Sequence, residues 1–557
     1  MARVEAKDIK FIEAHGTGTN LGDPIEVDAL SLAFNLDGQK SCALGSIKSN
    51  IGHLGEGAGI AGLIKAALTL KNGLLPASLN FETPNVKINF EDSPFYVNTK
   101  TVKLERNGIP LLGGVSSFGI GGTNAHIVLE EFIDEREESP DTEYDILPVS
   151  ATDKWSLKQN IQNLKAFLKG NSNLRINRLA QTLKQGRKDL PVREFIASKS
   201  SITDIIVNIE KLMGKPEKEA KRLEKTAFLF PGQGNQYLNM ARGMYENIQY
   251  LKQEMDICFK IADRYTDYDS PLKSLLFHEN ETDNAFNINN TELAQVVLFI
   301  VEYAVAKHLM HIGVNPDVLV GHSIGEYVAA CLAGVFELQD AIKIVCARGS
   351  LMQKAPIGKM LSVGLSETEL IQKLPDNLSL AAINSEDTCV VSGIEEDILF
   401  FQKQMEKENI PTKFLVTSHA FHSYLMDNVL EDFKEFFRGI NLQKPSKQFL
   451  SNVTGKVADA DYVSSPAYWS DQLRNTVRFK DCLSNIPKGI LLIEVGPGRS
   501  LSTFALQSQM PYAINTISHS QEIADDTVYY YNAIGNIWKH GIDINWENQS
   551  EGPVETI

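Results

Sequence analysis

The sequence predicts a multidomain α/β protein, and three observations carry this prediction. The chain has 557 residues, more than one core normally holds, which indicates about three to four domains. Hydrophobic residues make up 43% of the chain and charged residues 22%, a balance typical of globular proteins. Apolar runs such as Val318–Val320 and Thr226–Phe230 lead into glycine-containing turns, as strands do before a turn and a helix.

Composition also limits the partners and the compartment. The net charge of −16 argues against a surface that binds polyanions, so we do not expect nucleic acid as a partner. The six cysteines are scattered without close pairs, which favours a reducing compartment and gives no metal site. We expect no apolar run that approaches the length needed to span a bilayer, and the N-terminus lacks the apolar core of a signal peptide. We therefore expect a cytoplasmic protein that does not enter a membrane.

Residues 1–132 are rich in glycine and contain four distinctive blocks. The blocks are Glu13–Thr19, Gly22–Glu26, Gly45–His53 and Ser116–His126. Together they resemble the C-terminal half of a β-ketoacyl synthase, the condensing domain of polyketide and fatty acid synthases, which implies a partial thiolase-like fold. Taken singly, His15 or His53 is typical of an ordinary core or loop residue.

The resemblance implies a role for each matching residue of this segment. His15 and His53 correspond to the two histidines that stabilise an enolate and assist decarboxylation, and Lys48 to the lysine beside them. Neutral imidazoles suit that role because they can donate hydrogen bonds to a thioester oxygen as charge builds there. The backbone of Phe118–Ile120 corresponds to the loop that lines the acyl pocket.

The segment lacks the nucleophile that condensation requires. In the resembling family this cysteine lies in the N-terminal half, in a Thr-Ala-Cys-Ser-Ser type of turn, whereas Cys42 here lies in a strand-like run. We therefore expect either a piece of a larger synthase or a chain that a second polypeptide completes. The partners that we expect are the missing N-terminal half and, in a homodimer, a second copy of the chain. The apolar helix expected at 59–68 needs such a half as cover.

Residues 133–224 form the next predicted domain. An acidic run from Glu130 to Asp145 indicates a solvated linker, and lysine-rich helical stretches alternate with short apolar runs after it. The segment resembles the small α/β linker domain between condensing and acyltransferase domains. It shows no catalytic constellation, so spacing and support are its expected tasks.

A third domain is expected from 225 to 520, around the motif Gly321-His322-Ser323-Ile324-Gly325. A serine on a sharp strand-to-helix turn projects its hydroxyl beside the N–H groups of the helix start, and the flanking glycines make room for that turn. Small residues also gather at ordinary strand-to-helix turns. The motif alone therefore fits both a nucleophilic serine and a turn without a catalytic role.

Three further positions point to chemistry in this domain. Gln233 lies between two glycines after a strand and could bring an N–H close to a substrate, or mark a plain turn. Arg348 stands among small apolar residues, where its charge needs either a structural ion pair or a ligand carboxylate. His422 closes the run Ser418-His419-Ala420-Phe421-His422, which follows a small inserted sheet expected at about 358–416.

Gln233, Ser323, Arg348 and His422, in this order, resemble the malonyl-type acyltransferase domain of polyketide and fatty acid synthases. The resemblance implies an α/β-hydrolase-like core with a ferredoxin-like insert, and a post-acyltransferase linker at 521–557. It implies Ser323 as nucleophile, His422 as general base and acid, and oxyanion-hole N–H groups from Gln233 and Ile324. Arg348 would hold the acid end of a malonyl unit.

Two other histidines near these residues are alternatives to His422 as the base. His322 is expected to pack within the elbow, and His419 is the other candidate base. In the resembling family a backbone carbonyl orients the base, so a third acid is not required.

The His419–His422 block also implies selectivity for the extender unit. It matches malonyl-selective domains, in which Phe421 fills space that methylmalonyl-selective relatives leave open with a serine. We expect malonyl-CoA as donor and the phosphopantetheine thiol of an acyl carrier protein as acceptor, on a separate carrier domain. No cofactor bound covalently to this chain is expected.

The sequence also leaves two other functions open. A serine hydrolase or thioesterase shares the elbow but has no need of Arg348 or of the Gln233 loop. A non-catalytic scaffold half of a split synthase is plausible for residues 1–132, while the four-residue set argues against it for the rest of the chain.

Overall fold

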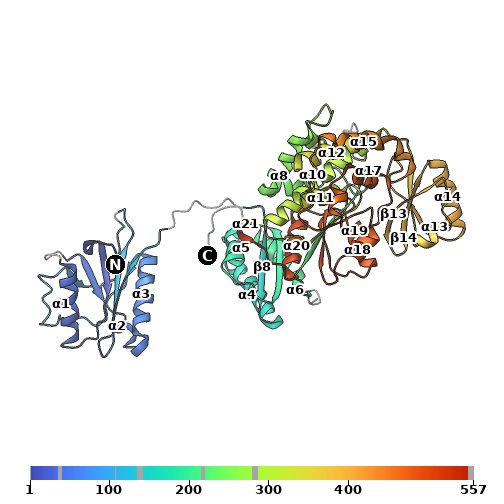
Figure 1. Ribbon diagram of the computed structural model, residues 1–557. Helices are drawn as coiled ribbons and strands as arrows, with labels where there is room; N and C mark the ends of the chain where they lie inside the picture. The colour runs from blue at the N-terminus through green and yellow to red at the C-terminus, as the bar shows by residue number, and fades with distance from the viewer. Residues whose placement is uncertain are drawn as a thin grey trace. The chain divides into compact units, whose positions relative to one another are not determined.

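The computed structural model describes residues 2–35, 40–106, 108–133, 142–214, 220–278, 287–522 and 524–549. The chain divides into two compact units, Met1–Glu137 and Glu138–Ile557 (Figure 1). Both contain helices and sheets, which confirms the predicted multidomain α/β class. Residues 134–141, half of the acidic run predicted as a linker, and the last eight residues lie outside the described residues.

The first unit contains a five-stranded sheet with the order β4-β2-β1-β6-β7 and a separate two-stranded sheet of β3 and β5. Its elements are β1 (Ile9–Glu13), α1 (Gly22–Phe34), β2 (Cys42–Gly45), α2 (Lys48–Ile51), α3 (Ala58–Asn72), β3 (Leu74–Leu75), β4 (Phe95–Val97), β5 (Val102–Lys103), β6 (Leu112–Phe118) and β7 (Asn124–Glu130). The sheet is parallel except for β7. Because neighbouring residues of a strand face opposite sides, Ile12 packs with the α1 residues and Phe11 with the α3 residues.

Helix α3 buries only one of its two apolar faces. Ala66 and Leu70 lie in the core, whereas Ile60, Ile64 and Leu68 are exposed at 57%, 54% and 52%. These three residues are four positions apart and therefore form one continuous stripe along the helix. A stripe of large apolar side chains of this kind is typical of a surface that another protein segment covers.

The second unit begins with a small subdomain between 142 and 214. Its two antiparallel strands, β8 (Tyr144–Ala151) and β9 (Val192–Lys199), pack against α4 (Lys154–Gly170), α5 (Ile176–Gln185) and α6 (Ile202–Met213). Helix α20 (Asp526–Lys539) returns from the far end of the chain to lie beside them (Figure 1). The Trp538 indole N–H donates to Asp189, and Arg193 lies over the Trp538 ring. The end of the chain thus holds this subdomain onto the main body.

The main body is built on a parallel sheet with the order β16-β11-β10-β17-β18. Its strands are β10 (Thr226–Phe230), β11 (Val318–Gly321), β16 (Phe449–Leu450), β17 (Leu491–Pro497) and β18 (Ala513–Ile517). The first four are buried along their whole length, as expected of strands covered on both faces. The helices are α7 (Arg242–Asn247), α8 (Gln249–Ala262), α9 (Leu272–Leu276), α10 (Thr291–His311), α11 (Gly325–Ala333), α12 (Leu338–Gln353), α15 (Leu430–Phe436), α16 (Ala460–Val463), α17 (Pro466–Arg474), α18 (Phe479–Ser484), α19 (Ser500–Gln507) and α21 (Trp546–Gln549).

Helix α10 is longer and more apolar than the sequence led us to expect. This helix of 21 residues is long and apolar enough to cross a membrane by length and composition, so the expectation that no run approaches that length was wrong. Its apolar window is 89% buried within the fold, however, and α10 packs against α8 and α12. The helix is apolar all round because it lies in a protein core.

A second, smaller sheet interrupts the main body between α12 and His419. Its elements in chain order are β12 (Lys359–Val363), α13 (Glu367–Ile371), β13 (Ser379–Ser385), β14 (Thr388–Gly393), α14 (Glu395–Lys407) and β15 (Thr412–Phe414). The strands lie in the order β13-β14-β12-β15, and each pairs antiparallel with its neighbour. The chain then re-enters the main body at the segment that carries His419 and His422.

Candidate active site

The serine of the central motif lies on a strained turn between β11 and α11. Ser323 has a φ of 53°, the left-handed region that a residue with a side chain rarely adopts. A Cβ on Gly325 would lie 2.2 Å from the Phe230 carbonyl oxygen, and one on Gly321 would lie 2.0 Å from the Glu326 nitrogen. Both glycines are therefore required for the close packing of strand and helix that holds Ser323 in this conformation.

His422 lies within hydrogen-bond distance of the serine. Its Nε2 is 2.8 Å from the Ser323 Oγ, and its Nδ1 is 3.0 Å from the Asn475 carbonyl oxygen. A carbonyl can only accept, so Nδ1 carries the proton and Nε2 is left with a lone pair toward the serine hydroxyl. Burial, and secondly the Arg348 cation, lower the pKa of His422 to about 3, so the ring is neutral at physiological pH. A neutral imidazole with this tautomer can take the serine proton.

The two other histidines of the region are occupied elsewhere. His322 is half-buried, and its Nε2 lies 2.8 Å from the Asn384 Oδ1. The Nδ1 of His419 lies 2.8 Å from the Ser418 Oγ. The structure therefore brings His422, and neither of these two, to the serine hydroxyl.

The guanidinium of Arg348 is buried beside the serine. The side chain is 1% exposed, Nη2 donates to the Ser323 Oγ at 3.3 Å, and Nη1 donates to the Gln295 Oε1 at 2.7 Å. Its Nε has no hydrogen-bond partner, and no carboxylate within the described residues forms an ion pair with it. The Tyr327 ring, 5.3 Å from the guanidinium carbon, and the charge of the Glu326 carboxyl stabilise the cation, but burial still lowers the pKa of Arg348. A buried cation without an ion-paired carboxylate is costly, which makes this position suited to an anionic ligand.

The Gln233 loop lies against the serine turn. A Cβ on Gly232 would lie 2.9 Å from the His322 carbonyl oxygen, which shows how closely the two loops approach. Neither the Gln233 nor the Ile324 backbone N–H donates to an acceptor in the described parts of the chain, and both polar atoms of the Gln233 side chain are buried without a partner. Two unengaged N–H groups near a serine can receive a developing oxyanion.

Polar residues distant in sequence stabilise the serine turn, and sequence reasoning missed them. Asn452 accepts from the Ser323 N–H at 2.8 Å and donates to the Gly321 carbonyl at 2.7 Å, while Gln472 donates to the Ser323 carbonyl at 2.7 Å. Glu326 accepts from the Asn452 N–H, and burial raises the pKa of Glu326 to about 7. The sequence feature that could have pointed to such residues is an amide or carboxyl side chain within an apolar run, because a buried polar group needs a hydrogen-bond partner. Gln295 in α10 is an example.

A cavity of about 500 Å³ lies between the end of α12, the start of β12 and the segment before His419, and none of Gln233, Ser323, Arg348 or His422 lines it. Its lining includes Gln353 at the end of α12, Lys359 at the start of β12, and Ser418. Helix α12 carries Arg348, and the Ser418 hydroxyl contacts His419. The cavity is therefore connected to the serine site through α12 and through the segment that carries His419 and His422.

The first unit gathers its own predicted residues at the end of β1. The His15 and His53 rings are 5.8 Å apart, and the Lys48 ammonium donates to the His15 carbonyl. The Phe118 N–H lies 3.3 Å from the His15 Nδ1. Burial, and then the Lys48 charge, lower the pKa of His15, which favours the neutral ring.

Cys42 cannot serve as a nucleophile in this unit. It lies within β2 at 0% exposure, and burial raises the pKa of its thiol to about 12. No group of three or more His, Cys, Asp or Glu side chains in the described part of the chain could hold a metal ion.

Family models match three successive parts of the chain. Residues 1–82 match the β-ketoacyl synthase C-terminal domain, 84–197 the ketoacyl-synthetase C-terminal extension, and 227–508 the acyl transferase domain. The extension model thus runs across the boundary between the two compact units.

Related proteins agree with these models. A phenolphthiocerol/phthiocerol polyketide synthase of Mycobacterium tuberculosis is 35% identical over 98% of this chain, and the chain covers 38% of its length. Mycoketide-CoA synthase of the same species is 32% identical over 98% of the chain, which covers 13% of that protein. The chain thus spans well under half the length of these relatives.

Two solved acyl transferase domains align with about three quarters of the chain. That of ZmaA is 32% identical with a TM-score of 0.69, over 75% of this chain and 99% of its own. That of SpnD, in complex with 2-(pent-4-yn-1-yl)malonyl, is 30% identical with a TM-score of 0.65, over 73% and 98%. The chain therefore belongs to the acyl transferase domain family over residues 227–508, and ahead of that domain it carries a match to the C-terminal part of a β-ketoacyl synthase, as the polyketide synthases that it resembles do.

Proposed function

We propose that the acyl transferase domain moves a malonyl extender unit from coenzyme A, through an ester on Ser323, to the phosphopantetheine thiol of an acyl carrier protein. The observation that carries this proposal is the buried Arg348 guanidinium, whose Nη2 lies 3.3 Å from the Ser323 Oγ and which forms no ion pair with a described residue. A malonyl carboxylate two carbons from the reacting carbonyl would supply the missing counter-charge at the right place.

The site residues would carry out the transfer in two half-reactions. His422 Nε2 takes the proton of the Ser323 hydroxyl while Oγ attacks the thioester carbonyl, and the Gln233 and Ile324 N–H groups receive the oxyanion. The C–S bond then breaks, and the departing thiolate of coenzyme A takes the proton from His422. In the second half-reaction the carrier thiol gives its proton to His422 and attacks the ester, which restores the serine hydroxyl.

The surroundings of the site support the remaining assignments. We place the pantetheine arm of the donor in the cavity lined by Gln353, Lys359 and Ser418, because amide and hydroxyl side chains suit an amide-bearing chain. The parallel sheet with its serine turn supports an α/β-hydrolase-like core, and the order β13-β14-β12-β15 supports a ferredoxin-like insert.

Under this proposal the condensing segment needs the N-terminal half of a condensing domain for activity, from the same polypeptide or from another. Its exposed Ile60, Ile64 and Leu68 stripe supports such a covering segment. His15, His53 and Lys48 would then act together with a cysteine that this other half supplies.

Intact-protein mass spectrometry tests the proposed function most directly. Wild type and Ser323→Ala are mixed briefly with malonyl-CoA, the reaction is quenched, and the mass of each intact protein is measured. We expect a malonyl adduct on the wild type that is absent from Ser323→Ala. An adduct that survives this substitution, or a wild type that takes no acyl group from malonyl-, methylmalonyl- or acetyl-CoA, contradicts the proposal.

Phe421 is the proposed gate for the extender unit. The side chain is 6% exposed, and its ring lies 6.2 Å from the His419 ring in a stacked arrangement, so the position is already filled. We expect Phe421→Ser to raise the ratio of methylmalonyl to malonyl loading by roughly 10-fold or more, because the bulk that excludes the extra methyl is removed. Phe421→Leu serves as the control that keeps an apolar side chain, and an unchanged ratio in the serine variant would mean that another residue selects the extender.

A further inference from the structure

The segment Asn475–Arg478 belongs to the main body by sequence but pairs with the inserted sheet. It connects α17 to α18, and Val477 forms a parallel bridge to Ala382 of β13. The Val477 N–H donates to the Ala381 carbonyl, and the Ile383 N–H donates to the Val477 carbonyl, both at 2.9 Å. The segment therefore acts as a short extra strand at the edge of the inserted sheet.

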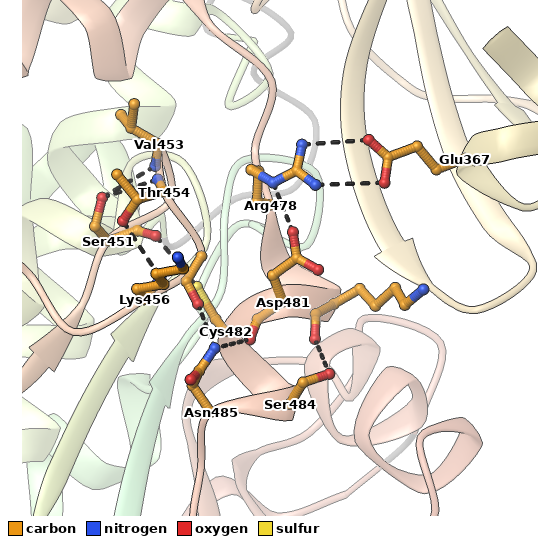
Figure 2. A network of polar contacts seen from close by, with 12 residues as sticks. Glu367, Ser451, Val453, Thr454, Lys456, Arg478, Asp481, Cys482, Ser484 and Asn485 are labelled. Carbon is orange, nitrogen blue, oxygen red and sulfur yellow. Dashed lines mark hydrogen bonds and ion pairs between the residues drawn. The ribbon is translucent and has the colours of Figure 1, made fainter.

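Arg478 fastens this segment to the inserted subdomain (Figure 2). Its two terminal nitrogens donate to the two Glu367 carboxylate oxygens at 3.2 and 3.3 Å, and its Nε donates to Asp481 at 2.6 Å. Glu367 lies at the start of α13, whereas Asp481 lies in α18. The Arg478 and Glu367 side chains are only 31% and 29% exposed, and a partly shielded, two-pronged ion pair holds its geometry better than a surface pair.

The segment held in this way orients the catalytic histidine. Asn475, three residues before Arg478, provides the carbonyl that accepts from the His422 Nδ1 at 3.0 Å. This carbonyl fixes the tautomer in which Nε2 faces the Ser323 hydroxyl, and it would also stabilise the imidazolium that forms when the proton is taken. A small displacement of the segment would therefore turn or tilt the base.

We propose that Arg478 is a positioning residue, and that its ion pair with Glu367 holds the Asn475 carbonyl within hydrogen-bond distance of the His422 Nδ1. The clamp acts on the serine and histidine pair through the backbone and does not touch the substrate. The inference rests on the proposed function only in taking Ser323 and His422 as the reacting pair.

Two reagents test the clamp independently of each other. The first is malonyl-CoA, with the rate constant of Ser323 acylation and the KM measured by rapid quench. The second is an uncharged fluorophosphonate, which reacts with an activated serine whatever acyl group the enzyme prefers. The variants are Glu367→Gln, which removes the charge but keeps the shape, and Arg478→Lys, which keeps the charge but loses the two-pronged contact. Glu408→Gln is the matched control, because it removes the Lys373–Glu408 pair within the inserted subdomain.

We expect both clamp variants to lose roughly 10- to 100-fold in the rate constant with each reagent, with KM for malonyl-CoA and the free energy of unfolding close to those of Glu408→Gln. Wild-type rate constants in both variants would overturn the clamp and leave the proposed function intact. A wild type that reacts with the fluorophosphonate but not with acyl-CoA would overturn the proposed function, and the fluorophosphonate rates would still decide the clamp. A wild type inert to both reagents would overturn both.

Discussion

Replacing His422 by alanine is expected to lower the rate constant for acylation of Ser323 by roughly 100- to 10,000-fold, the usual contribution of a positioned general base. The Nε2 of His422 is 2.8 Å from the serine oxygen, and the other side chain that contacts this oxygen is the Arg348 cation, so the described residues provide no second base at the serine. Rapid-quench mass spectrometry with malonyl-CoA measures this loss. His419→Ala and His322→Ala test the two alternative bases, and a larger loss in either of them would contradict the assignment of His422.

The pH dependence of acylation provides a second check on His422. An ordinary histidine base loses activity as pH falls through about 6.5. Burial and the neighbouring Arg348 lower the pKa of His422 to about 3, so the ring stays neutral and competent well below that pH. We therefore expect the acylation rate constant to be nearly flat between about pH 5 and 8. An acid limb centred near 6.5 in the wild type would show that the base is another, more exposed group.

Local signals in the sequence explain which parts of the fold could be predicted. Strands β10 and β11 are continuous apolar runs, and the glycines around Ser323 mark the turn, because each of these constraints acts within a few residues. Helix α3 shows the limit of such signals. The sequence predicts that the apolar helix at 59–68 needs cover, but only the structure shows which of its faces the first unit leaves exposed, namely the stripe that begins at Ile60.

The residues that surround Ser323 and His422 could not be predicted from the sequence, and the reason is different. The group that orients His422 is a backbone carbonyl, which every residue has, so Asn475 carries no signal in its side chain. Arg478 pairs with Glu367 across 111 positions, and neither residue type is unusual on a protein surface. Contacts of this kind depend on the tertiary fold, which places the inserted sheet against the main body.

Replacing Arg348 by alanine is expected to reverse the preference of the site. Malonyl transfer should fall by roughly 100- to 1,000-fold, because a buried carboxylate would lose its counter-charge. Acetyl-CoA has no carboxylate, and removal of a desolvated cation leaves a more apolar pocket, so acetyl transfer should be retained or rise. The measurement is the ratio of acylation rate constants with the two donors in the wild type and the variant.

The same substitution separates an acyl transferase from a serine hydrolase. A hydrolase needs no guanidinium beside its serine, so equal changes with malonyl and acetyl donors would favour that rival. Arg348→Lys is the informative control, since it keeps the charge without the planar fork and should recover part of the malonyl rate. Loss of the Arg348 charge should also raise the pKa of His422, because that cation is the second cause of its depression after burial. The acid limb of the pH profile with acetyl-CoA should then move upward, which would show that one arginine both binds the extender carboxylate and keeps the base neutral.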